Sequence, residues 1–560
     1  MPTDVRTLRD VMENSARLYP ERTALAMVGG AGVTYGEFWR QARELSVFLR
    51  EQGVRAGDRV AILGENMPGW GIAYFATTTT GAVAVPILPD FHSTDIARII
   101  RHAEARVIFV SRRLLGKIGE LTLEEKGTTI LLEDFTILSP DASESDLDRS
   151  GLDRKPARPE HFTHPPAVNE KSEDMSPDDL AAIVYTSGTT GHSKGVMLTH
   201  GNLVSDAIAT VAISGVSKDD RLLSILPLPH TYECTLGLIT PVMIGACVYY
   251  LDKPPTAAAL LPAMARLKPT VMLSVPLIIE KIYKSKILPE LTSKPLLKRL
   301  HDVPFFRRIL HRIAGKKLLE IFGGRLRIFT IGGAPLAPDV ELFLREGRFP
   351  YAIGYGLTET APMVAGTGPE RTRYRSTGPP LPGTKIRIVK AKPDTGEGEI
   401  EVKGPTVMKG YYRDPDRTRE AFTEDGWLKT GDLGVFDSDG YLYIKGRSKN
   451  MILGPSGKNI YPEEIEAIIN EFETVRESVV YEQQNRLVAL VHLDYERLQK
   501  ALQSFTESDF RGRISDMLAE LQKQINARVP LYARIHKIVE QAEPFQKTPT
   551  QKIKRHLYVP

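Results

Sequence analysis

The stretch that decides the fold runs from Ile183 to His200 and reads I-V-Y-T-S-G-T-T-G-H-S-K-G-V-M-L-T-H. Its first three residues are apolar and β-prone, which predicts the end of a buried strand. A loop rich in glycine and hydroxyl side chains follows and ends at Lys194. Glycines let main-chain N–H groups approach an anion closely, while the hydroxyls and the lysine add donors and a positive charge. This combination predicts a cradle for a polyphosphate.

Two other interpretations of this loop are weaker. A solvated turn would explain the glycines and serines, but not a lysine and five hydroxyls placed directly after a strand. A Walker loop requires Gly-Lys-Ser or Gly-Lys-Thr at its end. Here Ser193 precedes Lys194 and Gly195 follows it, so the Walker pattern does not fit.

Length and composition limit the class of protein. A chain of 560 residues is too long for one hydrophobic core, so two or more domains are expected. Apolar residues make up 42% and charged residues 25%, as in ordinary globular proteins. A net charge of +4 is too small to indicate a nucleic-acid partner.

The sequence predicts a cytoplasmic location. Cys234 and Cys247 match no disulfide framework or zinc pattern, which favours buried thiols in a reducing compartment. The N-terminus lacks the apolar core of a signal peptide. No run approaches the ~20 apolar residues that a membrane-spanning helix needs. Nothing in the sequence decides the oligomeric state.

Most of the chain has an α/β pattern. Residues 1–55 carry apolar residues at helical spacing and are predicted to be helical. From Asp58 onward, short apolar runs such as R-V-A-I-L and R-V-I-F-V are separated by helical patterns, and similar runs return at 221–276. Strands that alternate with helices predict largely parallel sheets. Residues 136–178 are polar and proline-rich, which predicts a poorly ordered surface excursion.

Three predicted strands end in polar or glycine-containing loops, at 186–195, 332–336 and 354–360. In open α/β sheets, ligands bind beyond the carboxyl ends of the strands. The three loops are therefore expected to converge on one cleft.

The last third of the chain changes pattern. From Gly383, runs such as K-I-R-I-V and G-Y-L-Y-I-K-G alternate with period two and predict a β-rich subdomain. A domain boundary is expected in G-R-S-K-N-M-I-L (446–453). The remaining residues, about 110 by this division, have the βαββα pattern of a small α+β domain and end in a basic tail at 546–555.

A strongly basic segment extends from Lys281 to Arg327 and contains thirteen Lys or Arg against three Asp or Glu. Within it, apolar residues at helical spacing form a stripe surrounded by Arg and Lys: Phe306, Ile309, Leu310 and Ile313. The favoured interpretation is a helix whose stripe packs against its own domain. The alternative is peripheral contact with an anionic membrane surface, at the inner membrane face.

Five motifs in this order resemble the adenylate-forming superfamily of acyl-CoA synthetases, acyl and aryl ligases, luciferases and adenylation domains. The phosphate loop of that family is T-S-G-T-T-G-x-P-K-G, which 186–195 matches except that Ser193 replaces the proline. The other four matches are Y-G-L-T-E-T (355–360), W-L-K-T-G-D (427–432), G-R-S-K-N (446–450) and P-T-Q-K-I-K-R (549–555). In the last motif, Gln551 stands where the family usually has glycine.

The resemblance implies three domains or segments: an adenylation domain at 1–446, a hinge at 447–449 and a mobile lid domain at 450–560. It also implies ATP and Mg²⁺ as cofactors and CoA as a substrate. The residues that it places around ATP are Thr186, Ser187, Gly188, Thr189, Thr190, Gly191, Lys194, Gly333, Ala334, Tyr355, Gly356, Thr358, Asp432 and Arg447.

Within that set the resemblance implies separate roles. The 186–194 loop would hold the β- and γ-phosphates, Tyr355 would stack on adenine, and Thr358 would contact the α-phosphate. Asp432 would accept hydrogen bonds from the ribose, with Arg447 nearby. Glu359, with Thr186, would bind Mg²⁺, a hard cation that prefers oxygen donors.

Lys552 is the residue expected to drive adenylation, by bridging the substrate carboxylate and the α-phosphate as a mobile point charge. After adenylation the small domain would rotate about Lys449. Gly454 and Gly457 would then face the cleft and let the backbone lie close to the pantetheine arm of CoA.

The acid is expected to be a fatty acid, with a long chain favoured. Two features indicate this: the stretch P-L-P-H-T-Y-E (227–233) and the basic segment. His230 matches the histidine that acyl and aryl ligases place beside the carboxylate, and the basic segment resembles that of long-chain fatty acyl-CoA synthetases. An acyl-AMP ligase, an acyl–carrier-protein synthetase and a medium-chain or aryl acid–CoA ligase remain alternatives. A nucleotide sensor would be expected to lose Glu359 or Lys552, and a membrane scaffold would leave the five motifs unexplained.

Overall fold

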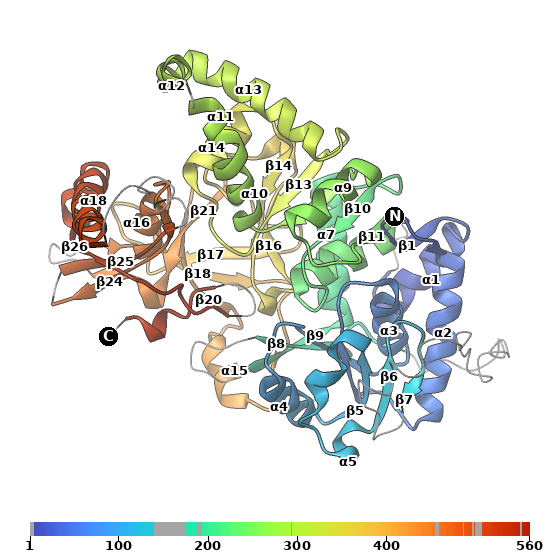
Figure 1. Cartoon of the computed structure of the whole chain (residues 1–560). Helices are drawn as coiled ribbons and strands as arrows, with labels where there is room; N and C mark the ends of the chain where they lie inside the picture. The colour runs from blue at the N-terminus through green and yellow to red at the C-terminus, as the bar shows by residue number, and fades with distance from the viewer. Residues whose placement is uncertain are drawn as a thin grey trace.

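The computed structural model describes residues 5–138, 175–186, 193–292, 294–453, 459–484, 486–495, 498, 507–548 and 552–559, with only the backbone for 507–512 (Figure 1). Two large sheets form the centre of this part of the chain, and four smaller sheets of two to four strands accompany them. The molecule is of the mixed α/β class, as the sequence predicts.

The first large sheet has eight strands in the order β19-β9-β8-β4-β3-β5-β6-β7. Its strands are β3 (Arg59–Leu63), β4 (Val83–Ile87), β5 (Ala105–Val110), β6 (Thr128–Leu131), β7 (Ile137–Leu138), β8 (Leu180–Thr186), β9 (Lys194–Thr199) and β19 (Gly410–Tyr411). The strands from β8 to β6 run parallel, while β7, β9 and β19 pair antiparallel at the edges. The central strands are buried on both faces, which is why they appear in the sequence as continuous apolar runs.

The second large sheet has the order β14-β13-β12-β10-β11-β1-β2. Its strands are β1 (Thr23–Met27), β2 (Gly32–Thr34), β10 (Arg221–Ser224), β11 (Cys247–Tyr250), β12 (Val271–Ser274), β13 (Ile328–Ile331) and β14 (Tyr351–Ile353). All neighbours are parallel except β1 and β2.

The prediction that residues 1–55 are helical throughout is wrong in one place. Helices α1 (Leu8–Leu18) and α2 (Tyr35–Glu51) are present, but β1 and β2 lie between them. Strand β1 is only five residues long and pairs with β11, more than two hundred residues later in the chain. A distant partner of this kind leaves no local periodicity in the sequence.

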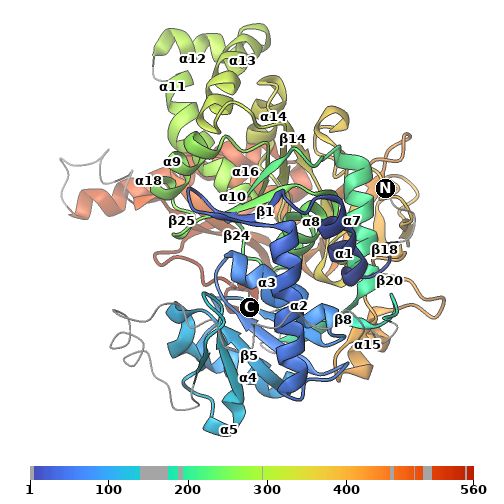
Figure 2. The same cartoon turned by 90° about the vertical axis from the view of Figure 1, so that its right-hand side faces the viewer.

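Helix α3 (Pro68–Thr79) joins the two large sheets. Its residues from Trp70 to Thr79 are all buried, and a helix that is covered all round belongs in a core. The same cluster of buried side chains includes Leu25 of β1 and Ile62 of β3, one from each sheet. Helix α2 lies alongside α3 (Figure 2).

Further helices cover the sheets. They are α4 (Ser93–Ala103), α5 (Leu123–Lys126), α7 (His200–Ser214), the π-helix η3 (Tyr232–Ile239), α8 (Thr240–Ile244), α9 (Ala257–Leu267) and α14 (Pro338–Glu346). None of the helices described is long and apolar enough to cross a bilayer.

The predicted β-rich region is an antiparallel sheet in the order β17-β18-β20-β21. Its strands are β17 (Lys385–Val389), β18 (Gly398–Lys403), β20 (Leu428–Phe436) and β21 (Leu442–Arg447). A short helix, α15 (Pro415–Ala421), lies between β19 and β20 in the chain.

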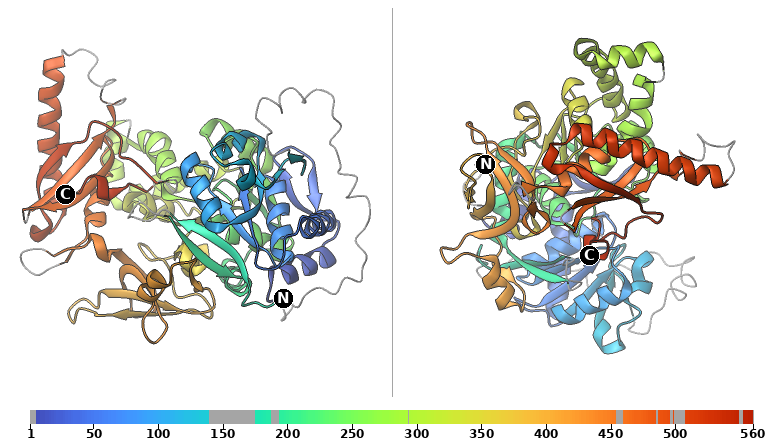
Figure 3. Two further views of the ribbon diagram at one scale, coloured as in Figure 1. Left: turned by 90° about the horizontal axis from the view of Figure 1, so that it is seen from below. Right: turned by 90° about the vertical axis from the view of Figure 1, so that its left-hand side faces the viewer.

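The C-terminal part forms a unit with its own core, seen at one side of the molecule in Figure 3. It contains β22 (Ile452–Leu453), β23 (Asn459–Ile460), α16 (Pro462–Ile469), β24 (Val475–Gln483), β25 (Arg486–Leu493), α18 (Glu507–Arg528) and β26 (Ile535–Glu540). The buried side chains of its core lie between Ile452 and Ile538.

The basic segment is a succession of helices at the top of Figure 1. They are α10 (Pro276–Ile282), the π-helix η4 (Tyr283–Ile287), α11 (Leu288–Thr292), α12 (Pro295–Asp302) and α13 (Pro304–Ile321). The favoured packing of the apolar stripe is wrong for three of its four residues: Phe306, Ile309 and Ile313 are 42%, 42% and 56% exposed. Only Leu310 packs against the core.

Candidate active site

The three predicted loops meet at the carboxyl ends of β8, β13 and β14. Gly354, after β14, donates its N–H to Ile331 at the end of β13 (3.1 Å). Lys194, at the start of β9, reaches Glu359 in the 3₁₀ turn Thr358–Thr360. The predicted convergence is therefore present in the structure.

Lys194 and Glu359 form an ion pair that Tyr411 completes. The Lys194 Nζ lies 2.7 Å from Glu359 Oε1 and 2.6 Å from the Tyr411 hydroxyl. Tyr411 in turn donates its hydroxyl proton to Glu359 Oε1 at 2.9 Å. Burial alone would raise the pKa of Glu359, but the Lys194 charge and these hydrogen bonds outweigh burial and leave the pKa lowered. Glu359 is therefore an anion at neutral pH.

A second polar group forms around Asp432 on β20. Its Oδ2 accepts a hydrogen bond from the Tyr355 hydroxyl (2.7 Å), and its Oδ1 lies 2.9 Å from Nε of Arg447 on β21. The two strands are in register here, with Asp432 opposite Arg447. Burial raises the pKa of Asp432, while Arg447 and Tyr355 act in the opposite direction. Tyr355, Asp432 and Arg447, which the sequence places near the nucleoside, thus lie together.

Lys552 reaches the same cleft from the C-terminal unit. It is exposed to solvent, yet enough protein surrounds it to lower its pKa, and the nearby Arg447 charge lowers it further. The charges of Asp432 and Glu359 also act on Lys552, in the direction that raises its pKa.

His230 also lies near Lys552. Burial, and then the Lys552 charge, lower the pKa of His230 to about 4, so its imidazole is neutral at physiological pH. Its Nδ1 accepts a hydrogen bond from the N–H of Tyr232 at 3.2 Å. The hydroxyl of Tyr232 pairs with Thr330 of β13 at 2.8 Å.

The remaining predicted residues are of three kinds: two glycines that their surroundings require, three other described residues, and seven that the structure does not describe. Gly333 has φ +85°, and Gly356 lies so close to Pro362 O that a Cβ there would approach it to 1.8 Å, so both positions require glycine. Ala334 and Lys449 are exposed, and Thr358 is half-buried beside Glu359. The others lie outside the described residues: Ser187, Gly188, Thr189, Thr190, Gly191, Gly454 and Gly457.

The described residues fit a magnesium–nucleotide complex. Glu359 offers an ionised carboxylate, and the hydroxyl of Thr186 is buried without a hydrogen-bond partner in the structure. Thr186 lies opposite Lys194 in the β8–β9 pairing, and hence near the phosphate loop. Among the residues described, no cluster of three or more His, Cys, Asp or Glu could hold a metal alone. One carboxylate is what Mg²⁺ uses when phosphates and water supply the other ligands.

Tyr411 is the residue that the sequence did not reveal. It lies in K-G-Y-Y-R-D-P (409–415), where two tyrosines follow a glycine with φ +144°. These letters suggest an irregular strand, and Tyr411 itself carries no charge that would indicate a phosphate or a metal. Its role becomes visible only because β19 pairs with β9, which begins at Lys194.

Comparison with known proteins gives consistent results. The family described as "AMP-binding enzyme" matches residues 12–412. The long-chain-fatty-acid–CoA ligase FadD15 of Mycobacterium bovis is 31% identical, over 93% of this chain and 90% of that protein. The peroxisomal long chain acyl-CoA synthetase 6 of Arabidopsis thaliana is 30% identical, over 88% of this chain and 74% of that protein.

Solved structures agree in fold. The ATP-bound crystal structure of MatB from Rhodopseudomonas palustris superposes with a TM-score of 0.73 at 26% identity and covers 98% of each chain.

Proposed function

The chain belongs to the AMP-binding enzyme family, and from this premise we propose that it activates a long-chain fatty acid with ATP and transfers the acyl group to CoA. The observation that carries the proposal is the position of Lys552. Its charge acts on Asp432 and His230, and the charges of Arg447, Asp432 and Glu359 act on it. This is the arrangement that adenylation requires.

In the first half-reaction, a carboxylate oxygen of the fatty acid attacks the α-phosphorus of ATP. The bond to the bridging oxygen breaks, and pyrophosphate leaves with the electron pair. Both reactants are anions, so catalysis rests on positioning them and cancelling their charge. Lys552 would bridge the carboxylate and the α-phosphate, Thr358 would contact the same phosphate, and Lys194 would hold the departing pyrophosphate. Mg²⁺, when bound through Glu359 and Thr186, supplies further positive charge.

The nucleoside end of ATP is held by different residues. Tyr355 would present its ring to adenine while its hydroxyl stays on Asp432. Asp432 would accept the ribose hydroxyls, and Arg447 fixes its orientation through the 2.9 Å ion pair. Neutral His230 would lie beside the substrate carboxylate, where it can donate a hydrogen bond.

In the second half-reaction, the CoA thiolate attacks the acyl carbon and AMP leaves. We place the boundary of the rotating domain at 447–449, with 1–446 on one side and 450–560 on the other, and assign Lys449 as the hinge. Two hydrogen bonds across this boundary hold the C-terminal unit in the orientation that the structure has. Tyr461 donates to Glu397 Oε2 (2.8 Å) in the turn between β17 and β18, and Lys284 donates to the carbonyl of Asn470.

A small apolar cavity lies in the acid-binding half of the molecule and is the place that we propose for the acyl chain. It has a volume of about 30 Å³ and lies between the second large sheet and helices α7, η3 and α8, with Leu236, Ile244, Leu273 and Thr330 among its lining residues. Thr330 also bonds the hydroxyl of Tyr232, whose N–H donates to His230, so two hydrogen bonds link the cavity wall to that histidine. Neighbouring side chains would have to move to admit a whole chain.

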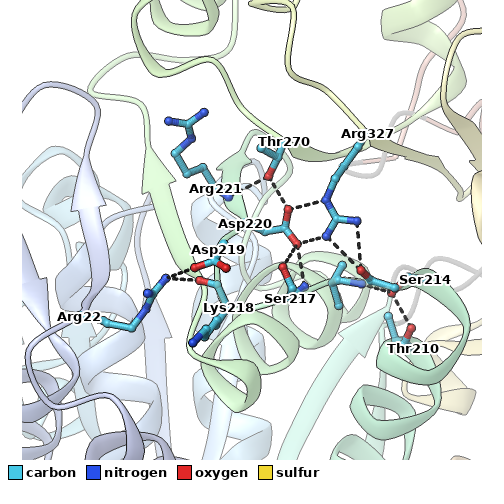
Figure 4. Close-up of polar contacts among 12 residues, drawn as sticks. Arg22, Thr210, Ser214, Ser217, Lys218, Asp219, Asp220, Arg221, Thr270 and Arg327 are labelled. Atoms are coloured by element: carbon cyan, nitrogen blue, oxygen red, sulfur yellow. Dashed lines mark hydrogen bonds and ion pairs between the residues drawn. The ribbon is translucent and has the colours of Figure 1, made fainter.

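A polar cluster around Asp220 (Figure 4) lies close in the chain to Ser214 and Val216, which line the cavity. Asp220 is buried and accepts hydrogen bonds from Arg327 Nε (2.7 Å) and from the Thr270 hydroxyl (2.7 Å). Ser214 of α7 lines the cavity on this side.

The direct test is pyrophosphate release with ATP and Mg²⁺ across acids of graded chain length, with and without CoA. The proposal expects release that increases with chain length and thioester formation when CoA is present. Absence of release with every acid would contradict the enzyme assignment. Release without any thioester would favour an acyl-AMP ligase, and acceptance of a carrier-protein thiol in place of CoA would favour the carrier-protein synthetase.

We further propose that helices α12 and α13 rest on an anionic membrane, at its inner face. Phe305, Phe306, Ile309 and Ile313 fall within an arc of about 100° on α13 at 3.6 residues per turn. The opposite side of α13 is the one that packs on the protein, since Ala314 and Leu318 are buried there. The apolar arc therefore points away from the core.

The partner is indicated by charge as well as by exposure. Four exposed cations lie beside or within the apolar arc: Arg308, Arg312, Lys316 and Lys317. Leu296 of α12 and Val303, directly before α13, add exposed apolar surface. An apolar face bordered by Lys and Arg matches the boundary between anionic headgroups and acyl tails. Fatty acids partition into this layer, so the surface would bring the enzyme to its substrate.

A further inference from the structure

Tyr411 connects the two groups that must separate when ATP and Mg²⁺ bind. Lys194 and Tyr411 both contact the same oxygen of Glu359, Oε1. Lys194 is expected to move onto a phosphate, and Glu359 is expected to bind Mg²⁺. If Lys194 leaves, the carboxylate loses one of the two contacts that fix its position, and the Tyr411 hydroxyl is the one that stays.

Backbone hydrogen bonds fix the position of Tyr411 relative to Glu359 and Lys194. Met408 donates its N–H to the carbonyl of Glu359 (2.9 Å), and Tyr412 donates to the carbonyl of Gly195 (2.8 Å). The N–H of Tyr411 itself bonds the Thr418 hydroxyl at 2.8 Å. The segment 408–412 is therefore attached both to the turn that carries Glu359 and to the strand that begins at Lys194.

We propose that Tyr411 is a positioning residue for the magnesium–nucleotide complex: it holds Glu359 by Oε1, leaves Oε2 for the metal, and keeps this orientation after Lys194 has moved onto the phosphates. This role rests on the proposed reaction with ATP. The tyrosine hydroxyl is then the contact to Glu359 that remains when Lys194 binds a phosphate.

The test compares Tyr411→Phe with Tyr412→Phe. Both changes remove one hydroxyl and keep the ring, but Tyr412 lies beside His102, at 5.7 Å between ring centroids, and has no contact with Glu359 among the described interactions. Calorimetry without fatty acid measures the Kd for ATP with Mg²⁺ and with EDTA. Tyr411→Phe is expected to weaken Mg²⁺–ATP about tenfold and to change metal-free ATP less than twofold, whereas Tyr412→Phe changes neither.

Two further measurements separate positioning from a general structural effect. The Mg²⁺ concentration that half-saturates pyrophosphate release is expected to rise in Tyr411→Phe, while thioester formation from supplied acyl-AMP and CoA stays unchanged. In a Glu359→Gln background, Tyr411→Phe should have no further effect on Mg²⁺–ATP binding, because the tyrosine acts through that carboxylate.

Three results would overturn the proposal. They are equal weakening of ATP with and without metal, an unchanged Kd in Tyr411→Phe, and a full additional loss in the Glu359→Gln background. Each differs from failure of the proposed function, which would be seen as no pyrophosphate release by the unaltered enzyme with any acid.

Discussion

The membrane-facing helices permit a quantitative prediction. Phe305, Ile309 and Ile313 are 66%, 42% and 56% exposed. Their exposed surface together corresponds to between one and two fully exposed side chains. Burying one such side chain is worth ~2 kcal/mol, so replacing all three by serine should remove about 3 kcal/mol of membrane affinity. Since 1.4 kcal/mol is a factor of ten, the partition coefficient should fall roughly a hundredfold.

Sedimentation with vesicles measures this change. The unaltered protein should bind vesicles rich in phosphatidylglycerol and bind neutral phosphatidylcholine vesicles much less, because each Lys or Arg near an anionic surface contributes ~1 kcal/mol. Raising the salt concentration should weaken the electrostatic part, since the Debye length shortens. The triple variant should lose binding at both low and high salt, because its loss is apolar.

Matched controls are available on other faces. Leu123 of α5 and Leu531 are 57% and 76% exposed, and α5 lies at the end of the molecule opposite α12 in Figure 1. Leu123→Ser and Leu531→Ser should leave vesicle binding unchanged. The reasoning is refuted if the triple variant sediments like the unaltered protein, or if the control changes reduce binding equally. Pyrophosphate release with a short, water-soluble acid should be the same in all variants.

Three other perturbations have defined outcomes. Lys552→Ala should abolish acyl-AMP formation, while the variant still converts supplied acyl-AMP and CoA to thioester. The same change should raise the pKa of His230, measured by NMR titration, because the Lys552 charge lowers it. Equal loss of both half-reactions would contradict the two-orientation mechanism. Tyr461→Phe removes a hydrogen bond that supports the present orientation, so the ratio of thioester formation to adenylation, measured separately, should rise several-fold; an unchanged ratio would count against that contact. Burial raises the pKa of Asp206 to about 8, so the folded protein keeps a proton that the unfolded chain loses near pH ~4. The free energy of unfolding should therefore fall as the pH rises between these two values, by about 1.4 kcal/mol per pH unit. Asp206→Asn should reduce the fall in Tm between pH 5 and pH 8, and a parallel fall in both proteins would refute this assignment.

The parts of the fold that the sequence predicted are those whose signal is local. Strands β3, β4 and β5 are buried on both faces, and their apolar runs are continuous. Strand β1 was missed because its stability comes from β11, far along the chain. The packing of α13 was predicted wrongly for a related reason. A periodic apolar stripe shows that a helix has an apolar face, but the partner of that face depends on which side α14 and the core occupy.

The site divides in the same way. Glu359, Asp432 and Lys552 stand in motifs whose letters state their chemistry, and the structure brings them into one cleft. Their assigned roles remain predictions. Tyr411 could not be found from the sequence, because its only chemical feature is a hydroxyl and its partners come from segments 52 and 217 residues away.

The charges around Lys552 give a reason why this second lysine lies on the C-terminal unit, which we propose to rotate. Glu359 is paired with Lys194, and Asp432 is paired with Arg447. The charges of Asp432 and Glu359 act on Lys552, although each carboxylate already has its own cationic partner. Lys552 therefore adds one positive charge to two ion pairs whose charges already cancel. Two anions must meet during adenylation, and an additional cation favours that step. Once acyl-AMP has formed, the same cation would slow the release of AMP. Rotation of the C-terminal unit would withdraw this charge and leave the two paired groups in place, so one movement would both admit CoA and weaken the hold on AMP.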